Sequence, residues 1–326
     1  MVAYRLNFAA AATVALAATS VSASPVKRAD TSGCGISHNN GYNTNGGAGF
    51  PLESSGGQRS YTVRVPDGYD ANRQYPLIVD YHGNGGSSDS QYGNSRYDQY
   101  DEGRTNFIAV YPQGLDGHWE GAGYADKGVS DLQFTTDLVQ HMRENYCIDS
   151  ARIYASGKSN GGGFVGTLAC DPAGGDFAAF GMASAALYTD NLGDTARECK
   201  PARPSIPILE SHGTADTTIS YDGGEGYGGA LPAIPAWLNA WGVRDGCADQ
   251  AVVNTDQGNG VTVSEYSCNG VNNIVTGYKI EGLGHCWPVT GASNSDSGKD
   301  NCGNSPIDYT PIVLDFFNAW NINGAI

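Results

Sequence analysis

The sequence lacks several features that would place it in common functional classes. No C-x-x-C pair occurs among its eight cysteines, which argues against a structural zinc site and against thioredoxin-like redox chemistry. Basic residues number only 18 against 34 acidic ones, and a chain with net charge −16 is unsuited to nucleic acid. There is no internal repeat and no Ser/Thr/Pro-rich linker, so one catalytic or binding domain is the simplest organisation.

Long apolar runs are also missing, except at the N-terminus. Arg5 precedes a stretch of apolar and small residues at 8–21, Ala23 supplies a small residue for cleavage, and Lys27-Arg28 forms a dibasic pair. This is the layout of a secretory signal, and the stretch is too short to span a bilayer comfortably. We therefore expect residues 1–28 to be a signal peptide with a dibasic pro-segment. Residues 29–326 would form one secreted domain with no membrane partner.

The cysteines all follow this segment, and an even number in a secreted chain predicts disulfides. Cys286 and Cys302 are close in sequence, and we expect them to pair. Cys247 and Cys268 are expected to pair across neighbouring strands. The remaining four would then pair among themselves, and these are Cys34, Cys147, Cys170 and Cys199.

Short apolar runs alternate with helical patterns along most of the chain. We predict strands at 61–65, 77–81, 107–111, 152–156, 206–210 and 274–280, and helices at 131–146, 161–169, 233–241 and 307–320. The Gly- and Asn-rich residues 29–58 read as an irregular arm pinned by Cys34. Strands that alternate with helices indicate an α/β fold, a mostly parallel sheet with helices on both faces and with disulfides as reinforcement.

The strongest chemical signal is a G-x-S-x-G sequence at 157–161, centred on Ser159. It stands between a predicted strand and a predicted helix, as the nucleophile elbow of an α/β-hydrolase does. The flanking glycines let strand and helix approach closely and leave the serine hydroxyl exposed. A serine needs a base and a carboxylate that orients this base.

Chain order selects the partners of Ser159, because α/β-hydrolases place the acid and then the histidine after the serine. Only His212 and His285 follow Ser159. His285 lies in a glycine-flanked loop after a predicted strand, so we expect it to be the base and His212 to be structural. Asp216 follows another strand by a short turn and is the expected acid, ahead of Asp190, Asp194 and Asp222. A turn-capping role for Asp216 is the alternative.

A third motif, HGNGGS at 82–87, follows a buried strand and has the form of an oxyanion-hole loop. We expect one donor to be the N–H of Asn160, the residue after the nucleophile. The second donor would be the N–H of Asn84 or of Gly83, and the motif leaves this choice open.

These motifs resemble those of fungal feruloyl esterases, a carbohydrate esterase group that also includes acetyl xylan esterases and polyhydroxyalkanoate depolymerases. The resemblance covers most of residues 30–320. It is carried by YASGKSNGGG at 154–163, YHGNG at 81–85, YPQG at 111–114, SHGTAD at 211–216 and GHCWP at 284–288. It implies an α/β-hydrolase fold, Ser159, Asp216 and His285 as the triad, and ferulate esters of arabinoxylan as substrate. We expect a monomer that needs no cofactor and no metal.

The acyl group is specified less well than the reaction. A feruloyl ring needs an apolar slot, for which Trp287, Trp119, Tyr124 and Tyr227 are candidates, although aromatic residues are equally common in cores. An acetyl xylan esterase or a polyester depolymerase would share fold and triad. The alternative outside enzymes is a silent wall-binding protein. The oxygen-rich segment 293–301 could hold calcium, but such clusters normally mark solvated loops.

Overall fold

The computed structural model describes residues 32–291, 293–299 and 301–326. The predicted signal segment 1–28 and the predicted start at Ala29 lie outside the described residues. Within the described part of the chain, no helix is both long and apolar enough to cross a membrane.

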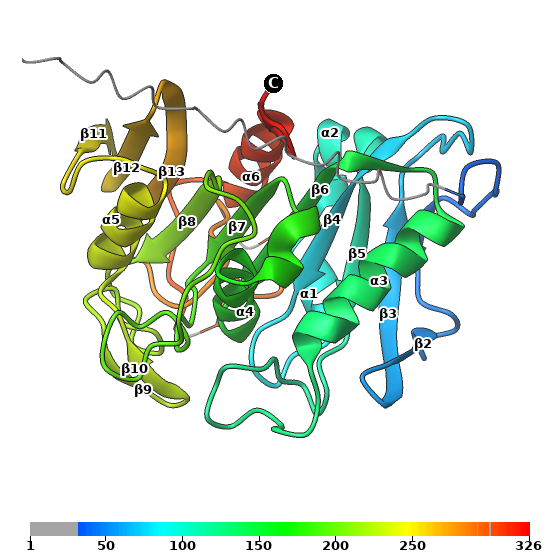
Figure 1. The fold of residues 1–326 in the computed structure, drawn as a ribbon, viewed down its shortest axis with the longest axis horizontal. Coiled ribbons are helices and arrows are strands. Elements are labelled where there is room, and N and C mark those ends of the chain that lie inside the picture. The colour runs from blue at the N-terminus through cyan, green and yellow to red at the C-terminus, as the bar shows by residue number, and fades with distance from the viewer. Residues whose placement is uncertain (1–31, 292, 300) are drawn as a thin grey trace, which may run out of the picture.

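One large sheet with the order β1-β3-β5-β4-β6-β7-β8-β13-β12-β11 forms the centre of the molecule (Figure 1). Six neighbouring strands run parallel. They are β5 (Ile108–Pro112), β4 (Tyr75–Tyr81), β6 (Ile148–Lys158), β7 (Ala179–Ala183), β8 (Ile208–Gly213) and β13 (Val271–Ile280). Antiparallel strands extend both edges. They are β1 (Gly41–Asn43), β2 (Phe50–Ser54) and β3 (Gly57–Val65) at one edge, and β12 (Val261–Cys268) and β11 (Val252–Gly258) at the other.

Helices cover both faces of the sheet, with α3, α4 and α5 on one face and α1 and α6 on the other (Figure 1). Their bounds are α1 Ser88–Ser95, α2 Asp101–Asn106, α3 Asp131–Asn145, α4 Asn160–Ala169, α5 Ile234–Arg244 and α6 Tyr309–Asn318. Parallel strands buried on both faces must be apolar throughout, and every residue of β4, β5, β7 and β8 is buried. The predicted α/β-hydrolase architecture is confirmed.

The predicted arm at 29–58 is only partly irregular. Its C-terminal half forms β1 and β2, which both pair with β3. Ser54 donates a hydrogen bond to Asp137 of α3, and this contact ties the segment to the first helix layer. β1 is short and contains Gly41 and Asn43, and β2 contains Pro51, so both have little intrinsic strand propensity and form only against a partner strand.

Four disulfides reinforce the fold. The expected pairs Cys286–Cys302 and Cys247–Cys268 are both present, but Cys247 lies in the loop after α5 and not in a strand next to that of Cys268. The other two bridges are Cys34–Cys147 and Cys170–Cys199. The first of these fixes the N-terminal segment to the end of α3, as the pinning of the arm by Cys34 required.

Candidate active site

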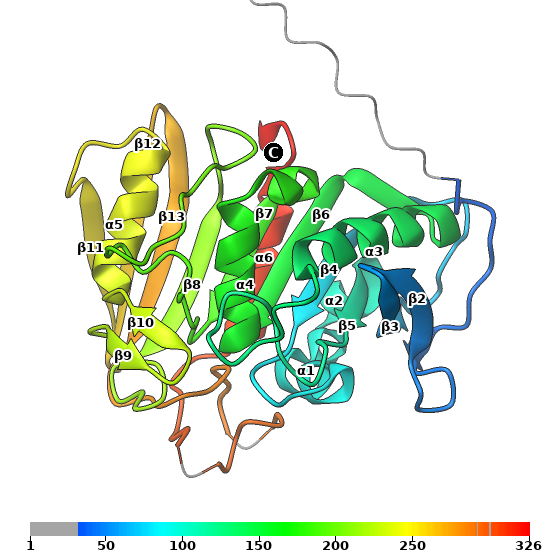
Figure 2. The same ribbon diagram turned by 60° about the horizontal axis from the view of Figure 1, so that its bottom comes forward.

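The site lies where several parallel strands end, since the carboxyl ends of parallel strands meet at one edge of a sheet. Figure 2 turns this edge forward and shows the loop that follows β13 passing beside α1. Ser159 follows β6, Asp216 follows β8, and His285 follows β13. Three predicted catalytic residues from separate strands are thereby brought together.

Ser159 occupies a strained turn between β6 and α4, with φ 58° and ψ −121°. A non-glycine residue rarely adopts such a conformation, and it persists only where neighbouring packing enforces it. The packing is visible at the flanking glycines. A Cβ on Gly161 would lie 2.1 Å from the carbonyl oxygen of Tyr81. A Cβ on Gly157 would lie 2.7 Å from the carbonyl oxygen of Gly161. The turn thus requires glycine on both sides and aims the serine out of the sheet.

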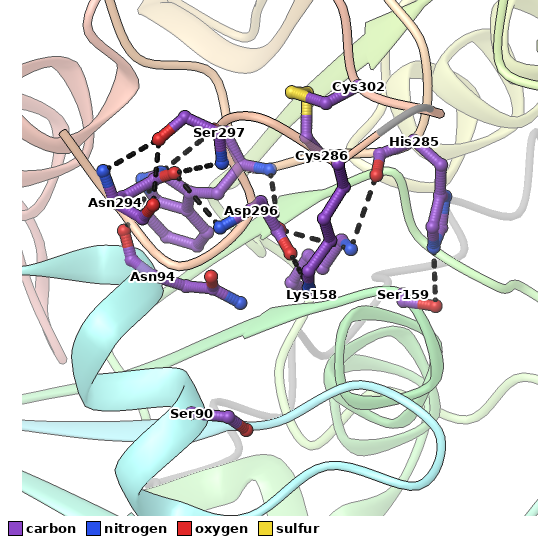
Figure 3. Close-up of polar contacts among 12 residues, drawn as sticks. Ser90, Asn94, Lys158, Ser159, His285, Cys286, Asn294, Asp296, Ser297 and Cys302 are labelled. Atoms are coloured by element: carbon purple, nitrogen blue, oxygen red, sulfur yellow. Dashed lines mark hydrogen bonds and ion pairs between the residues drawn. A yellow bond between two sulfur atoms is a disulfide. The ribbon is translucent and has the colours of Figure 1, made fainter. Parts of the chain in front are cut away.

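A continuous hydrogen-bond chain joins the three residues. Ser159 Oγ lies 2.9 Å from His285 Nε2 (Figure 3). On the other side of the ring, His285 Nδ1 lies 2.7 Å from Asp216 Oδ2. Because a carboxylate only accepts, Nδ1 carries the proton and Nε2 is free to accept from the serine. The arrangement has the distances that a serine nucleophile and its base need.

Asp216 satisfies both the predicted role and its alternative. Its Oδ1 accepts hydrogen bonds from the backbone N–H groups of Thr218 and Ile219, which closes the turn, while Oδ2 faces His285. Burial opposes ionisation of Asp216, but the hydrogen bond from His285 and the surrounding N–H groups outweigh it and lower the pKa of the carboxyl. Asp216 is therefore held as an anion.

His285 is held in its neutral form by a different balance. Burial lowers the pKa of the imidazole, the positive charge of Lys158 lowers it further, and Asp216 opposes both. The net pKa lies below the ordinary histidine value, so the ring stays available as a base into mildly acidic solution.

His212 has a structural role, as expected, because its ring bonds to neighbouring residues and not to Ser159. It also adds a charge to the site. One ring nitrogen lies 2.8 Å from Glu210 Oε1 and the other 2.8 Å from the carbonyl oxygen of Ile219. A ring whose nitrogens both face acceptors donates from both, which makes it imidazolium. Burial disfavours that form, but Glu210 outweighs burial and raises the pKa of His212. This cation lies 3.5 Å from Asp216 Oδ2.

The HGNGGS loop approaches the nucleophile through Gly83. A Cβ on Gly83 would lie 3.2 Å from the Cβ of Ser159, whereas Asn84 is exposed. The Gly83 N–H shares its peptide group with the carbonyl of His82, which accepts a hydrogen bond from the indole N–H of Trp119, and this contact fixes the orientation of that peptide. Burial lowers the pKa of His82 to about 4, which keeps that ring neutral. The geometry favours Gly83 over Asn84 as the second oxyanion donor.

Trp119 does not line an acyl slot, which corrects the prediction. The side chain is fully buried, and its indole N–H donates to the carbonyl oxygen of His82. Its backbone N–H and carbonyl both bond to the amide of Asn160. Trp119 therefore couples the HGNGGS loop to the nucleophile elbow, and its ring faces have no free surface for a ligand.

Trp287 does not line an acyl slot either, contrary to the prediction. It is fully buried, and its indole N–H donates to Thr310 Oγ1 at the start of α6. Its ring packs edge-on against Tyr97 and Tyr309. A residue two positions after the base was expected to border the substrate, but the chain turns between these positions and sends the indole into the core.

Tyr124 and Tyr227 remain accessible. Tyr227 is 86% exposed, and its ring stacks on that of Tyr124 at 5.4 Å. Tyr124 also packs against a small apolar cluster that includes Tyr188 and Ala186. The Ala186 N–H donates to the carbonyl oxygen of Ser159, so this cluster lies beside the nucleophile.

The segment 293–299 carries an ion pair that sequence reasoning missed. Asp296 is fully buried and contacts the ammonium groups of Lys158 and Lys299 at 3.1 and 2.6 Å (Figure 3). Its carboxylate is thus already neutralised, and the calcium alternative loses its central ligand. Asp300, part of the same cluster, lies outside the described residues. The only sequence signal was a lysine inside the G-x-S-x-G motif.

Fold and site together define an α/β-hydrolase with a serine–histidine–aspartate arrangement at the ends of its central strands. Sequence comparison gives the family. Over 206 residues, the chain is 30% identical to feruloyl esterase C of Emericella nidulans, a match that spans 61% of this chain and 67% of the relative. It is 30% identical to feruloyl esterase B of Piromyces equi over 234 residues, 70% of this chain and 42% of the relative. The chain belongs to the fungal feruloyl esterase family.

Other comparisons are less specific. The chain spans 42% to 58% of the length of the first curated relatives that it matches. No family model matches the chain. Among solved structures, an acetyl xylan esterase from Aspergillus awamori superposes with a TM-score of 0.53 at 17% identity, over 71% of this chain and 90% of that one. At this identity the likeness concerns the fold alone.

Proposed function

We propose that the protein is a secreted serine esterase that hydrolyses hydroxycinnamate esters of plant arabinoxylan and releases ferulic acid. The observation that carries the proposal is the Ser159–His285–Asp216 hydrogen-bond chain at a strained elbow. An intact chain of this kind argues against a silent wall-binding protein. The feruloyl preference is supported by the family and by the aromatic surface beside the nucleophile.

The proposed reaction has two halves. Ser159 Oγ attacks the ester carbonyl carbon while its proton passes to His285 Nε2. The N–H groups of Asn160 and Gly83 stabilise the oxyanion, each lowering the barrier by about 2.7–4 kcal/mol. His285 then protonates the departing sugar alkoxide. In the second half, a water molecule gives a proton to His285 and attacks the acyl-enzyme, and the acid leaves as Ser159 is regenerated.

The test is a substrate panel with a matched variant. Wild-type protein and Ser159→Ala are assayed on methyl ferulate, feruloylated arabinoxylan fragments, acetylated xylan and polyhydroxybutyrate. We expect the highest kcat/KM on the feruloyl esters. Ser159→Ala should lower kcat by about 10⁴-fold or more, and adding His285→Ala should cost little further, since triad members act as a unit.

Each outcome discriminates between the alternatives. Faster cleavage of acetylated xylan than of any hydroxycinnamate ester would reassign the chain to the acetyl esterases, and a preference for polyhydroxybutyrate would reassign it to the depolymerases. Near wild-type turnover by Ser159→Ala would show that Ser159 is not the nucleophile. A wild-type protein inert to all esters and to a fluorophosphonate would favour the wall-binding alternative.

A further inference from the structure

Lys158 is an unusual residue to find beside the nucleophile. It is 7% exposed, and its Nζ lies 3.1 Å from Asp296 Oδ2. The same ammonium lies 3.4 Å from the carbonyl oxygen of His285, to which it donates. Removing a lysine from water is costly, and buried ion pairs seldom add net stability over apolar replacements. Such a pair therefore calls for a role other than stability.

Lys158 and Asp296 each bond to the backbone of the loop that carries His285. While Lys158 holds the carbonyl of His285, Asp296 Oδ2 accepts a hydrogen bond from the N–H of Trp287, two residues further on (Figure 3). Lys158 itself is fixed, because it is the last residue of β6 and precedes Ser159 directly. The nucleophile strand is thereby linked to the loop of the base through one ion pair.

Asp296 is held in turn by its own loop and by α1. Lys299 contacts Asp296 Oδ1 at 2.6 Å, and Asn294 Oδ1 accepts from the backbone N–H of Asp296. The Ser295 N–H donates to the carbonyl oxygen of Gly93 in α1. A Cβ on Gly93 would lie 2.0 Å from Ser295 Oγ, which shows how closely loop and helix pack. The carboxylate is therefore anchored.

We propose that Lys158 and Asp296 form a positioning pair that fixes the backbone of His285 and Trp287 relative to Ser159 and sets the electrostatic environment of the base. Neither side chain is assigned a contact with the reacting atoms, so both act through His285. The inference rests on the proposed function, since it assumes that His285 is the base.

The charges around these groups predict the direction of a pH effect. Asp216, Lys158 and His212 face His285 and shift its pKa. Burial opposes ionisation of Asp296, but Lys158 and Lys299 outweigh it and lower the pKa of the carboxyl. Burial lowers the pKa of Lys158, which Asp296 and Asp216 raise and Lys299 lowers. Removing the Lys158 cation should raise the pKa of His285 and narrow the acidic range of activity.

The experiment compares Lys158→Met with Lys299→Met. Both variants remove an ammonium from Asp296, but Lys299 contacts neither His285 nor Ser159 in the hydrogen-bond and ion-pair network. Two readouts are taken across pH: kcat and KM on methyl ferulate, and the rate of inactivation by a fluorophosphonate, which does not depend on the acyl preference. For Lys158→Met we expect kcat to fall about 10- to 100-fold, KM to change by less than about threefold, and the acid midpoint to rise by roughly 0.5–1 pH unit.

A third variant separates positioning from folding. Lys158→Met/Asp296→Asn removes both buried charges and leaves only the exposed ammonium of Lys299 without its partner, so it should fold even if Lys158→Met does not. Its low kcat and raised midpoint should persist, while Lys299→Met should match wild type within about twofold. Wild-type kcat and pH profile in the double variant, or equal losses in Lys158→Met and Lys299→Met, would overturn the inference. Absence of ester turnover and of fluorophosphonate reaction in the wild type would instead reject the proposed function.

Discussion

At the scale of single residues, proximity in sequence to the proposed base does not indicate which aromatic side chain is available to the substrate. Trp287 is two residues from the proposed base but is fully buried, whereas Tyr124, distant in sequence, stacks on the exposed Tyr227 and packs against the cluster whose Ala186 bonds to Ser159. Trp287→Ala should therefore lower kcat/KM for feruloyl and acetyl esters equally and lower the free energy of unfolding by about 3–5 kcal/mol. Tyr124→Ala should lower the feruloyl value selectively.

Both variants are measured on methyl ferulate and on an acetyl ester, with urea unfolding alongside. Tyr124 has a matched partner for comparison in Tyr227→Ala, which removes the other ring of the stack. A loss confined to feruloyl substrates in Trp287→Ala would restore the original interpretation of Trp287 and contradict the buried geometry.

Some residues of the site could be predicted from the sequence and others could not. Ser159, Asp216 and His285 could be singled out because chain order and strand ends constrain them, and the structure brings all three together. The Lys158–Asp296 pair could not, because a buried ion pair depends on which loop the tertiary fold lays over which strand. Gly83 and Asn84 are equivalent in a motif, and only the close approach of Gly83 to Ser159 distinguishes them.

At the scale of elements, the junction of β6 and α4 depends on the absence of one side chain. A Cβ on Gly161 would lie 2.1 Å from a backbone carbonyl, which cannot move without disturbing β4. Gly161→Ala should therefore destabilise the protein by at least about 2–3 kcal/mol and reduce esterase activity by a larger factor than the folded fraction explains. Thermal unfolding and the activity per folded molecule are the measurements.

Gly57→Ala is the matched control for this junction. Gly57 lies in β3, where a Cβ would meet no atom within 4 Å. The control should stay within about 0.5 kcal/mol of the wild type, as substitutions away from such features do. If Gly161→Ala were as stable and as active as this control, the close helix–strand approach would not be a requirement of the site.

Four helices and six strands were predictable to within a few residues because their apolar pattern is strong, whereas the short, mostly polar helices α1 and α2 were not predicted. The helix predicted at 131–146 is α3, Asp131–Asn145, and the strand predicted at 77–81 is the end of β4. The strands that were not predicted have a weaker sequence pattern or are short. β2 and β11 lie in polar or glycine-rich sequence, and β7 is short, so their identity comes from pairing within the sheet rather than from their own pattern.

At the scale of the whole molecule, buried acids make stability depend on pH. Burial raises the pKa of Asp80, next to the last residue of β4, to about 7, and its Oδ2 has no hydrogen-bond partner among the described residues. An acid whose folded pKa is raised stabilises the fold while protonated, and this contribution is lost as pH rises from about 4 through 7. Asp80→Asn should therefore gain stability relative to wild type between pH 5 and pH 8, by about 1–3 kcal/mol.

Urea unfolding of wild type and Asp80→Asn at these two pH values measures the effect. The exposed Asp101→Asn serves as the control and should show no comparable difference. Asp245, whose pKa burial also raises to about 7, keeps its contribution in both proteins, so the comparison isolates Asp80. An equal stability difference at pH 5 and pH 8 would show that Asp80 ionises freely in the folded state.

The linear order of the site along the chain has a consequence for biosynthesis. The proposed nucleophile and acid follow β6 and β8, but the proposed base follows β13, which pairs with β8 and is made only after the α5 and β11–β12 segments. The bridge that closes the loop after His285 needs Cys302, later still. Any nascent or prematurely terminated chain that stops before residue 285 therefore carries a serine without its base. Under the proposed function, ester turnover would therefore report only those molecules that were translated past that point.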